Sequence, residues 1–186
     1  MTIWFTSDNH YGHKNILKFN PATRRGETVE EMNQLMIRRW QEQVQPGDIV
    51  WTLGDVFFCK ADEAKSILRQ LPGQINHVWG NHDKVISQNK SLYDMFASHH
   101  DYVELNLPEA RVVLFHFPIF EWNRMHHGAY HLFGHVHGNT TIPGRALDVG
   151  IDGELSSFDM GLYSWEQVHA HLSKKEIRSH HGKTEM

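Results

Sequence analysis

The chain has 186 residues, which is long enough to bury a core and predicts a single domain. Hydrophobic residues make up 40% of it and charged residues 22%, a composition that excludes a disordered chain. The formal net charge of −4 argues against tight binding to long nucleic acid, which needs an excess of Lys and Arg, but leaves short strands open.

The sequence predicts neither a signal peptide nor a membrane span. Residues 1–20 lack the charged start and apolar block of a signal peptide, and no apolar run approaches the roughly 18 residues of a membrane span. The single cysteine, Cys59, cannot form an internal disulfide. We therefore expect a cytoplasmic protein without a membrane partner. The sequence gives no indication of its oligomeric state.

The first half of the chain alternates between short apolar strands and helices. Three strands are expected, at residues 3–7, 48–53 and 75–79. Thr28 and Glu31 form a capping-box pattern at the start of a helix that ends before Pro46, and a second helix is expected at about residues 61–71. This alternation favours parallel strands joined by right-handed crossovers, which bind ligands at their carboxyl ends.

The second half is expected to build another sheet. After a helix at 91–96, a hairpin should pair residues 102–107 with 111–115, and strands should follow at 131–133 and 145–151. A final helix is expected from Ser164, which forms a capping pattern with Gln167, to about residue 172. We expect one domain over residues 1–172 and a charged, frayed tail over 173–186. Four histidines near this end are interpreted as surface residues: His169, His171, His180 and His181.

Polar residues that can bind a metal follow five of these apolar segments. Taken singly, each motif is weak, because Asp8 could cap a helix and His10 could be an exposed loop residue. Carboxylate, amide and imidazole groups without a thiolate suit Mn²⁺, Fe²⁺ or Zn²⁺. Seven candidates are too many for one ion, so the pattern indicates two ions and leaves His82 as a proton donor. The candidate ligands are Asp8, His10, Asp55, Asn81, His116, His135 and His137.

The same residues carry a resemblance to a known family. The blocks Asp8-x-His10, Gly54-Asp55, Gly80-Asn81-His82-Asp83, His116 and Gly134-His135-x-His137 resemble the five signature blocks of calcineurin-like metallophosphoesterases, in the same order. The resemblance implies an α/β fold, a four-layer αββα sandwich with two mixed β-sheets face to face between helices. It also implies that Asp8, His10 and His137 hold one metal ion. The second ion would be held by Asn81, His116 and His135, and Asp55 would bridge the two.

Such a centre implies a reaction. Two divalent ions can turn a bridging water into hydroxide for in-line attack on a phosphoester, while His82 protonates or hydrogen-bonds the leaving oxygen. We therefore expect a dinuclear metal-dependent phosphoric ester hydrolase with Mn²⁺ favoured over Fe²⁺, Zn²⁺ or Ni²⁺. Its substrate would be a small nucleotide or another phosphomonoester or phosphodiester. A nuclease for short strands and a catalytically silent scaffold for a protein partner are the alternatives.

Loops should shape the substrate pocket. Val56-Phe57-Phe58-Cys59-Lys60 replaces the Asp and Arg with which the protein-phosphatase branch continues after Asp55, so the chain is more similar to the small, capless bacterial and phage phosphoesterases. Without a cap, residues 11–27 and 117–130 are expected to wall the pocket. A solvated charge pair is the alternative for the two arginines among the candidate substrate contacts, which are His13, Arg24, Arg25, Glu121 and Trp122.

Overall fold

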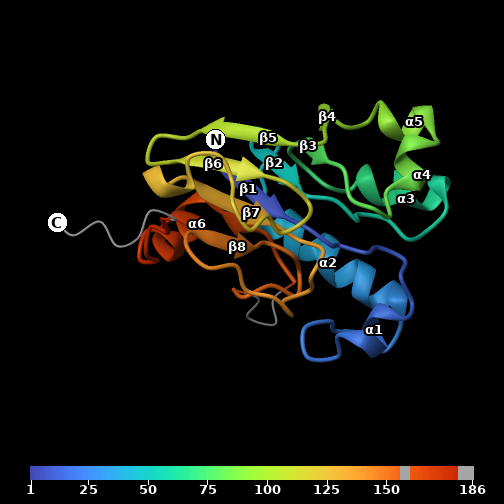
Figure 1. The fold of residues 1–186 in the computed structure, drawn as a ribbon. Helices are drawn as coiled ribbons and strands as arrows, with labels where there is room; N and C mark the ends of the chain where they lie inside the picture. The colour runs from blue at the N-terminus through green and yellow to red at the C-terminus, as the bar shows by residue number, and fades with distance from the viewer. Residues whose placement is uncertain (156–159, 180–186) are drawn as a thin grey trace.

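Two β-sheets lie face to face in the computed structural model, which describes residues 1–155 and 160–179 (Figure 1). The first sheet has the order β4-β3-β2-β1-β9, with β1 (Ile3–Thr6), β2 (Ile49–Thr52), β3 (Gln74–Val78), β4 (Ser98–His100) and β9 (Tyr163–Ser164). The second has the order β5-β6-β7-β8, with β5 (Val103–Asn106), β6 (Arg111–Leu114), β7 (Tyr130–Phe133) and β8 (Ala146–Asp148).

Both sheets are mixed. In the first, β1 to β4 run parallel and β9 pairs antiparallel with β1. In the second, β6, β7 and β8 run parallel, and β5 pairs antiparallel with β6 as the expected hairpin. The predicted parallel strands and the predicted second sheet are therefore confirmed. The sequence analysis missed β4, a short strand of small and imidazole side chains without an apolar run.

The helices are α1 (Ile16–Phe19), α2 (Val29–Gln43), α3 (Ala61–Leu68), α4 (Lys84–Ser87), α5 (Lys90–Tyr93) and α6 (Trp165–Leu172), with a 3-10 turn, η1 (Met125–His127). The expected start of α2 is confirmed, because the Thr28 side chain accepts a hydrogen bond from the Glu31 amide. The apolar stripe of α2, including Met36 and Trp40, packs with Val50 of β2 against the outer face of the first sheet.

The space between the sheets forms the second part of the core. Phe5 of β1 and Leu53, directly after β2, pack there against Leu114 and Leu132 from the second sheet, and Val168 of α6 joins them. The two face-to-face sheets with helices confirm the predicted fold class. On the outer face of the second sheet, the cover is the 117–129 segment with η1 rather than a long helix, and its side chains form a third cluster.

The end of the described chain packs on this framework. Arg145 donates hydrogen bonds to the carbonyl oxygens of Ser173 and Lys175. Residues 180–186 of the expected tail, including His180 and His181, lie outside the described residues. Within the described ranges, no helix combines the length and apolar character that a bilayer crossing requires.

The start of α6 is a test of how local capping contributes to stability. The Ser164 side chain accepts from the Gln167 amide, and the Gln167 side chain accepts from the Ser164 amide. Ser164→Ala should therefore lower the free energy of unfolding by about 1 kcal/mol in urea titrations. The matched control is Ser66→Ala on the exposed side of α3, which removes no cap and should leave stability unchanged or raise it by about 0.5 kcal/mol. Equal effects of the two changes would contradict the cap's contribution.

Candidate metal centre

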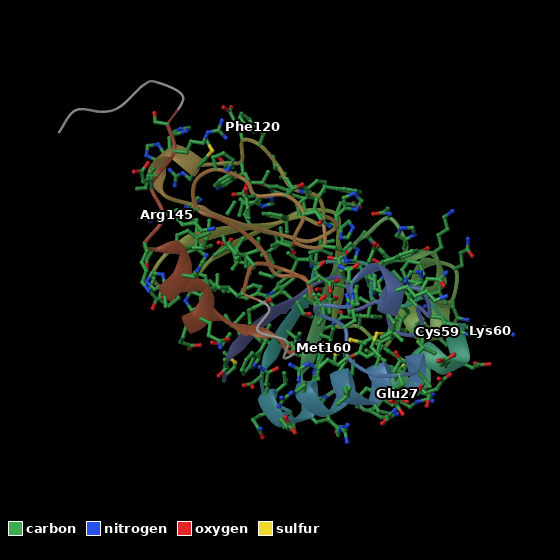
Figure 2. The ribbon with its side chains drawn as sticks, turned by 90° about the horizontal axis from the view of Figure 1, so that it is seen from below. Glu27, Cys59, Lys60, Phe120, Arg145 and Met160 are labelled. Atoms are coloured by element: carbon green, nitrogen blue, oxygen red, sulfur yellow. The ribbon has the colours of Figure 1, made fainter. Side chains whose placement is uncertain are left out.

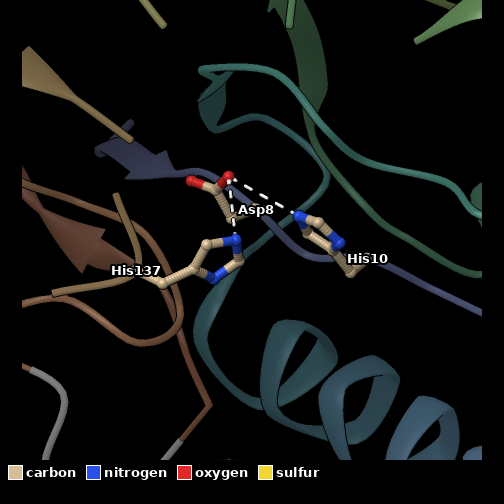
Figure 3. Close-up of side chains that lie close together, drawn as sticks. All are labelled: Asp8, His10 and His137. Carbon is tan, nitrogen blue, oxygen red and sulfur yellow. Dashed lines mark ion pairs between the residues drawn. The ribbon is translucent and has the colours of Figure 1, made fainter. Parts of the chain in front are cut away.

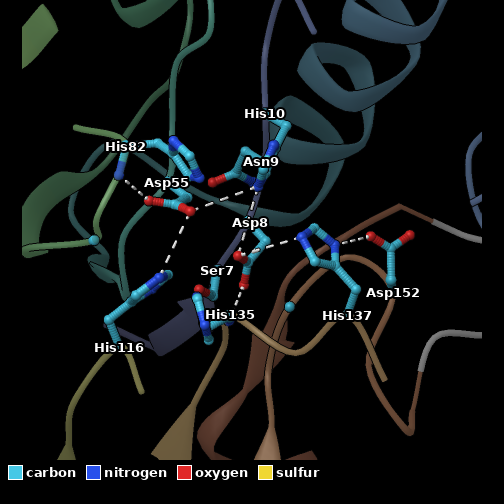
Figure 4. A network of polar contacts seen from close by, with 12 residues as sticks. Ser7, Asp8, Asn9, His10, Asp55, His82, His116, His135, His137 and Asp152 are labelled. Atoms are coloured by element: carbon cyan, nitrogen blue, oxygen red, sulfur yellow. Dashed lines mark hydrogen bonds and ion pairs between the residues drawn. The ribbon is translucent and has the colours of Figure 1, made fainter. Parts of the chain in front are cut away.

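The loops that follow five strands meet at one edge of the two sheets (Figure 4). The loops after β1 and β2 are joined by hydrogen bonds from the Asp8 amide to the Gly54 carbonyl and from the His10 amide to the Asp55 carbonyl, both 3.0 Å. In the second sheet, the Gly134 amide donates to the His116 carbonyl at 2.9 Å. The carboxyl ends of parallel strands meet at one edge of a sheet, and this geometry brings the candidate ligands together.

Asp8, His10 and His137 form the first group of possible ligands (Figure 3). One ligand atom from each lies within 4.8 Å of the other two. The Asp8 Oδ1 atom is 3.6 Å from His10 Nε2 and 3.9 Å from His137 Nε2. These three residues are the ones that the family resemblance implies for the first ion.

Asp55, His116 and His135 form the second group, again with ligand atoms within 4.8 Å of one another. Asn81 Oδ1 lies 3.0 Å from His116 Nε2, so the amide reaches the same point. The Asp55 Oδ2 atom lies 3.6 Å from His116 Nε2 and 3.9 Å from His10 Nε2, which places this oxygen between the two groups. That position is the one a bridging carboxylate requires.

The unpaired atoms in these groups fit a pair of cations. Asp8 Oδ1 and His10 Nε2 are buried without a hydrogen-bond partner, which is costly for polar atoms unless a ligand binds there. The His116 Nδ1–H donates to the Leu53 carbonyl at 2.6 Å, so in the neutral imidazole the lone pair is on Nε2, which lies 3.0 Å from Asn81 Oδ1. In that state two hydrogen-bond acceptors, His116 Nε2 and Asn81 Oδ1, face each other. A cation bound by both would remove the repulsion between their lone pairs.

A buried ion pair orients His137. The His137 Nδ1–H donates to Asp152 Oδ2 at 2.8 Å, which leaves Nε2 free as a ligand. Asp152 is held in turn by Arg24, whose Nη2 lies 2.8 Å from the same oxygen and whose Nε bonds Oδ1 at 3.0 Å. Burial alone would raise the pKa of Asp152, but the bond from His137 and the charge of Arg24 hold this pKa well below its usual range. Asp152 is therefore a carboxylate at neutral pH.

A second buried carboxylate, Asp83, supports the loops after β2 and β3. Its oxygens accept hydrogen bonds from the amides of Asp55, Val56 and Gly80 at 2.8–3.0 Å. Burial would raise the pKa of Asp83, but the neighbouring His77, 3.2 Å away, and these amides lower it to about 2. The sequence analysis assigned no role to Asp83 or Asp152. Asp83 stands in the block Gly80-Asn81-His82-Asp83 that carries the family resemblance, whereas the local signal for Asp152 is its place in a glycine-containing loop after a strand.

The backbone of the centre is strained. Asp8, His10, Asp55, His135 and His137 all have φ between 48° and 71°, the left-handed region that side chains with a Cβ rarely adopt. Such conformations persist where surrounding contacts impose them, and they cluster at functional sites. Gly134 is needed for a related reason, because a Cβ at this position would collide with Ser7 and Asp8.

His82 lies beside the two groups. Its amide donates to Asp55 Oδ1 at 2.8 Å, and its exposed imidazole is 4.9 Å from the ring of Phe58, measured between centroids. The Phe58 ring stacks on His10 and contacts His13, so His13 lies next to the centre. The imidazole of His82 is thus placed to reach a group bound at the centre.

Two of the expected substrate contacts are buried inside the protein. Arg24 is only 3% exposed and donates to the carbonyls of Asp8 and Asn9 as well as to Asp152. Trp122 is buried in the third core cluster, and its indole N–H donates to the Ala129 carbonyl. Neither side chain is available to a substrate. This corrects the expectation, which took Arg24 for a surface loop residue because sequence spacing does not show which way a side chain points. Arg25 and Glu121 are exposed.

Comparison with known proteins identifies the family. The model of the calcineurin-like phosphoesterase superfamily domain matches residues 1–145. The chain belongs to this superfamily. Membership of this family supports phosphoesterase activity and implies bound divalent metals. The two groups of possible ligands described above agree with this.

Individual relatives extend the comparison. Protein MJ1445 of Methanocaldococcus jannaschii is 42% identical over 84 residues, which cover 44% of this chain and 47% of that protein. The match therefore spans about half the length of that relative. The Gene 66 protein of Mycobacterium phage L5 is 27% identical over 84% of this chain and 90% of its own length. The structure of AQ665 from Aquifex aeolicus is similar with a TM-score of 0.69 and 23% identity over 91% of this chain and 98% of that one, which shows a shared fold.

The burial of Arg24 gives a direct test of its role. Arg24→Gln leaves the buried Asp152 charge without its partner and should lower the free energy of unfolding by about 3–5 kcal/mol. The control is Arg25→Gln, the same change at the exposed neighbour, which should alter stability by less than about 1 kcal/mol. Both are measured by urea denaturation. Similar small effects at the two positions would show that the ion pair does not hold this loop.

Proposed function

We propose that the protein is a dinuclear metal-dependent phosphoesterase that hydrolyses a small phosphoester, with the cytoplasm as its place of action. The observation that carries the proposal is the pair of ligand groups on either side of Asp55 Oδ2. Oxygen and imidazole ligands suit Mn²⁺, which we favour, and also Fe²⁺, Zn²⁺ or Ni²⁺. Two such ions would polarise the phosphoryl oxygens and activate a water for in-line attack.

The side chains of this chain have separate tasks in the reaction. Asp8, His10 and His137 would hold one ion, and Asn81, His116 and His135 would hold the other. Asp55 would bridge them through Oδ2 while its Oδ1 accepts from the His82 amide, so the bridge also fixes the loop that carries His82. The His82 imidazole would then give a proton or a hydrogen bond to the leaving oxygen.

Aromatic side chains beside the centre favour a substrate with a planar group, such as a small nucleotide. Phe58 and His13 lie on the side of His10, and the His13 ring is 6.2 Å from that of Phe19, which is 68% exposed. On the side of His135, the Phe117 ring lies 4.6 Å from the imidazole. Exposed rings of this kind can stack on a base.

The two alternatives are weaker. A silent scaffold would have no need for a complete set of candidate ligands with strained backbone, and this chain carries all seven proposed ligand residues and His82. A nuclease for short strands would use the same centre and the same rings, so it differs only in substrate length. Comparing hydrolysis of mononucleotides, cyclic nucleotides and short oligonucleotides separates the two.

Removal of the proposed bridge tests the dinuclear centre. The purified protein should bind two divalent ions per chain by elemental analysis. Asp55→Asn should lose metal and at least about 100-fold of its phosphoesterase rate, because the bridging charge is lost, while circular dichroism stays unchanged. Asp62→Asn on the surface of α3 removes the same charge elsewhere and should behave like the wild type. One ion per chain with full activity would refute the two-metal proposal.

The role of His82 is tested by varying the leaving group. His82→Ala should keep both ions, since the imidazole is not a proposed ligand. The rate should fall by about 10²–10⁴-fold for alkyl esters, whose alkoxide needs a proton, and much less for p-nitrophenyl esters. A loss that is the same for all leaving groups would assign His82 to phosphate binding or positioning instead.

A further inference from the structure

A cavity of about 280 Å³ in the second half of the chain gathers three arginine side chains. Arg111, Arg124 and Arg145 all line it, and Glu109 is the one carboxylate among the described residues around it. The Glu109 Oε2 atom already accepts a hydrogen bond from the Trp165 indole at 2.6 Å. The lining is therefore positive in a protein whose formal net charge is −4.

This cavity is remote from the metal centre. Arg111 is the first residue of β6 and Arg145 directly precedes β8, whereas His116 follows the other end of β6. Since β6, β7 and β8 run parallel, their first residues share one edge of the sheet and the metal ligands share the opposite edge. Five residues of extended chain separate the two edges by roughly 16 Å. Figure 2 shows Arg145 at the end of the molecule away from Cys59 and Lys60.

Two nitrogens of the Arg145 guanidinium donate hydrogen bonds to backbone carbonyls of the described chain, and the third donates none. Its Nε donates to the Lys175 carbonyl at 3.1 Å and its Nη2 to the Ser173 carbonyl at 3.2 Å, while the guanidinium lies 5.7 Å from the centre of the Tyr130 ring. The remaining nitrogen, Nη1, lies 3.3 Å from the place that a Cβ on Gly128 would take. Gly128, with φ of 83°, thus gives this nitrogen its space.

Arg124 is held in a strained conformation. Its φ of 60° and ψ of 21° lie in the left-handed region, where the other described residues with a side chain are the five metal-ligand candidates and Met160. The Arg124 carbonyl accepts from the amides of His127 and Ala129, which fixes the tight turn. Strain of this kind persists where the surrounding structure imposes it, and it clusters at functional sites.

Two of the arginines have unused hydrogen-bond donors. Among the described residues, none accepts a hydrogen bond from the guanidinium groups of Arg111 and Arg124. Like charges that share a cavity repel each other, and an anion removes this repulsion. Guanidinium forks match the oxygens of phosphate groups, with which they form strong charge-assisted hydrogen bonds.

We infer that this cavity binds a phosphate-type oxyanion at a second site, separate from the metal centre. The anion is either a free ion such as pyrophosphate or a phosphate group of a short single strand, because both present the same oxygens to the three guanidinium groups. The inference does not depend on the proposed function, since none of these arginines contacts the residues around Asp55.

Residue-resolved nitrogen–proton NMR of the full chain with Mg²⁺ tests the site. Titration with pyrophosphate should shift the amide signals of Gly128 and Ala129 with a Kd of about 1 mM or tighter. Signals of Gly80 and Gly134 report separately on the metal centre. In the double variant Arg111→Gln/Arg124→Gln, the Kd from Gly128 and Ala129 should rise at least about tenfold, while the response of Gly134 stays the same.

The control is the double variant Arg38→Gln/Arg69→Gln. It removes two exposed arginines from α2 and the end of α3 and should keep the Kd within about twofold of wild type.

A parallel titration with a short oligothymidine decides which kind of anion the cavity binds. Tighter binding than pyrophosphate supports a phosphate group of a strand, and weaker binding supports a free ion. Absence of shifts at Gly128 and Ala129 with both probes, or equal losses in the two double variants, would overturn the inference. The single variant Arg111→Gln repeats the test with the turn at Arg124 intact.

Discussion

The buried ion pair between Arg24 and Asp152 is the interaction on which the arrangement of the centre depends most. It joins residues that are 128 positions apart, and its oxygen Oδ2 also orients the imidazole of His137. The other nitrogens of Arg24 bind the carbonyls of Asp8 and Asn9, so one guanidinium connects the loop after β1 to the loop after β8. A buried charge without its partner is strongly destabilising, and the two sheets are therefore held in one relative position at this edge.

Asp83 connects loops within the first sheet in the same way. Three backbone amides from the loops after β2 and β3 donate hydrogen bonds to its carboxylate, and Nε2 of His77 in β3 lies 3.2 Å from it. With Asp152 on one side and Asp83 on the other, the ligand groups rest on two buried carboxylates that are not themselves proposed ligands. Such supporting groups orient the ligands of a metal centre. Contacts between the loops hold the left-handed backbone at the candidate ligand positions, among them the bond from the Asp55 amide to Asp83 and the bond from the His135 amide to Asp8.

The second sheet presents different chemistry at its two edges. At the carboxyl ends of β6 and β7 lie the imidazoles of His116, His135 and His137, which are candidate ligands for cations. At the opposite edge, arginines line a cavity that suits an anion. Parallel strands make this separation possible, because all their carboxyl ends point one way and all their amino ends the other. The acidic net charge of the whole chain does not determine the electrostatic potential at either edge. In physiological salt a charge acts over about one Debye length, roughly 8–10 Å.

The sequence by itself determined the local elements and the types of ligand. Apolar runs, the N-cap of α2 at Thr28, the capping box at Ser164 and the polar residues after the strands are short-range patterns, and the hydrogen bonds at the two caps are local. Only the tertiary structure decided the role of Arg24, which the sequence placed in a pocket wall and the fold buries against Asp152. The same holds for Trp122 and for the meeting of Arg111, Arg124 and Arg145. The direction of a side chain and its distant partners depend on how the loops pack, and no local pattern records that packing.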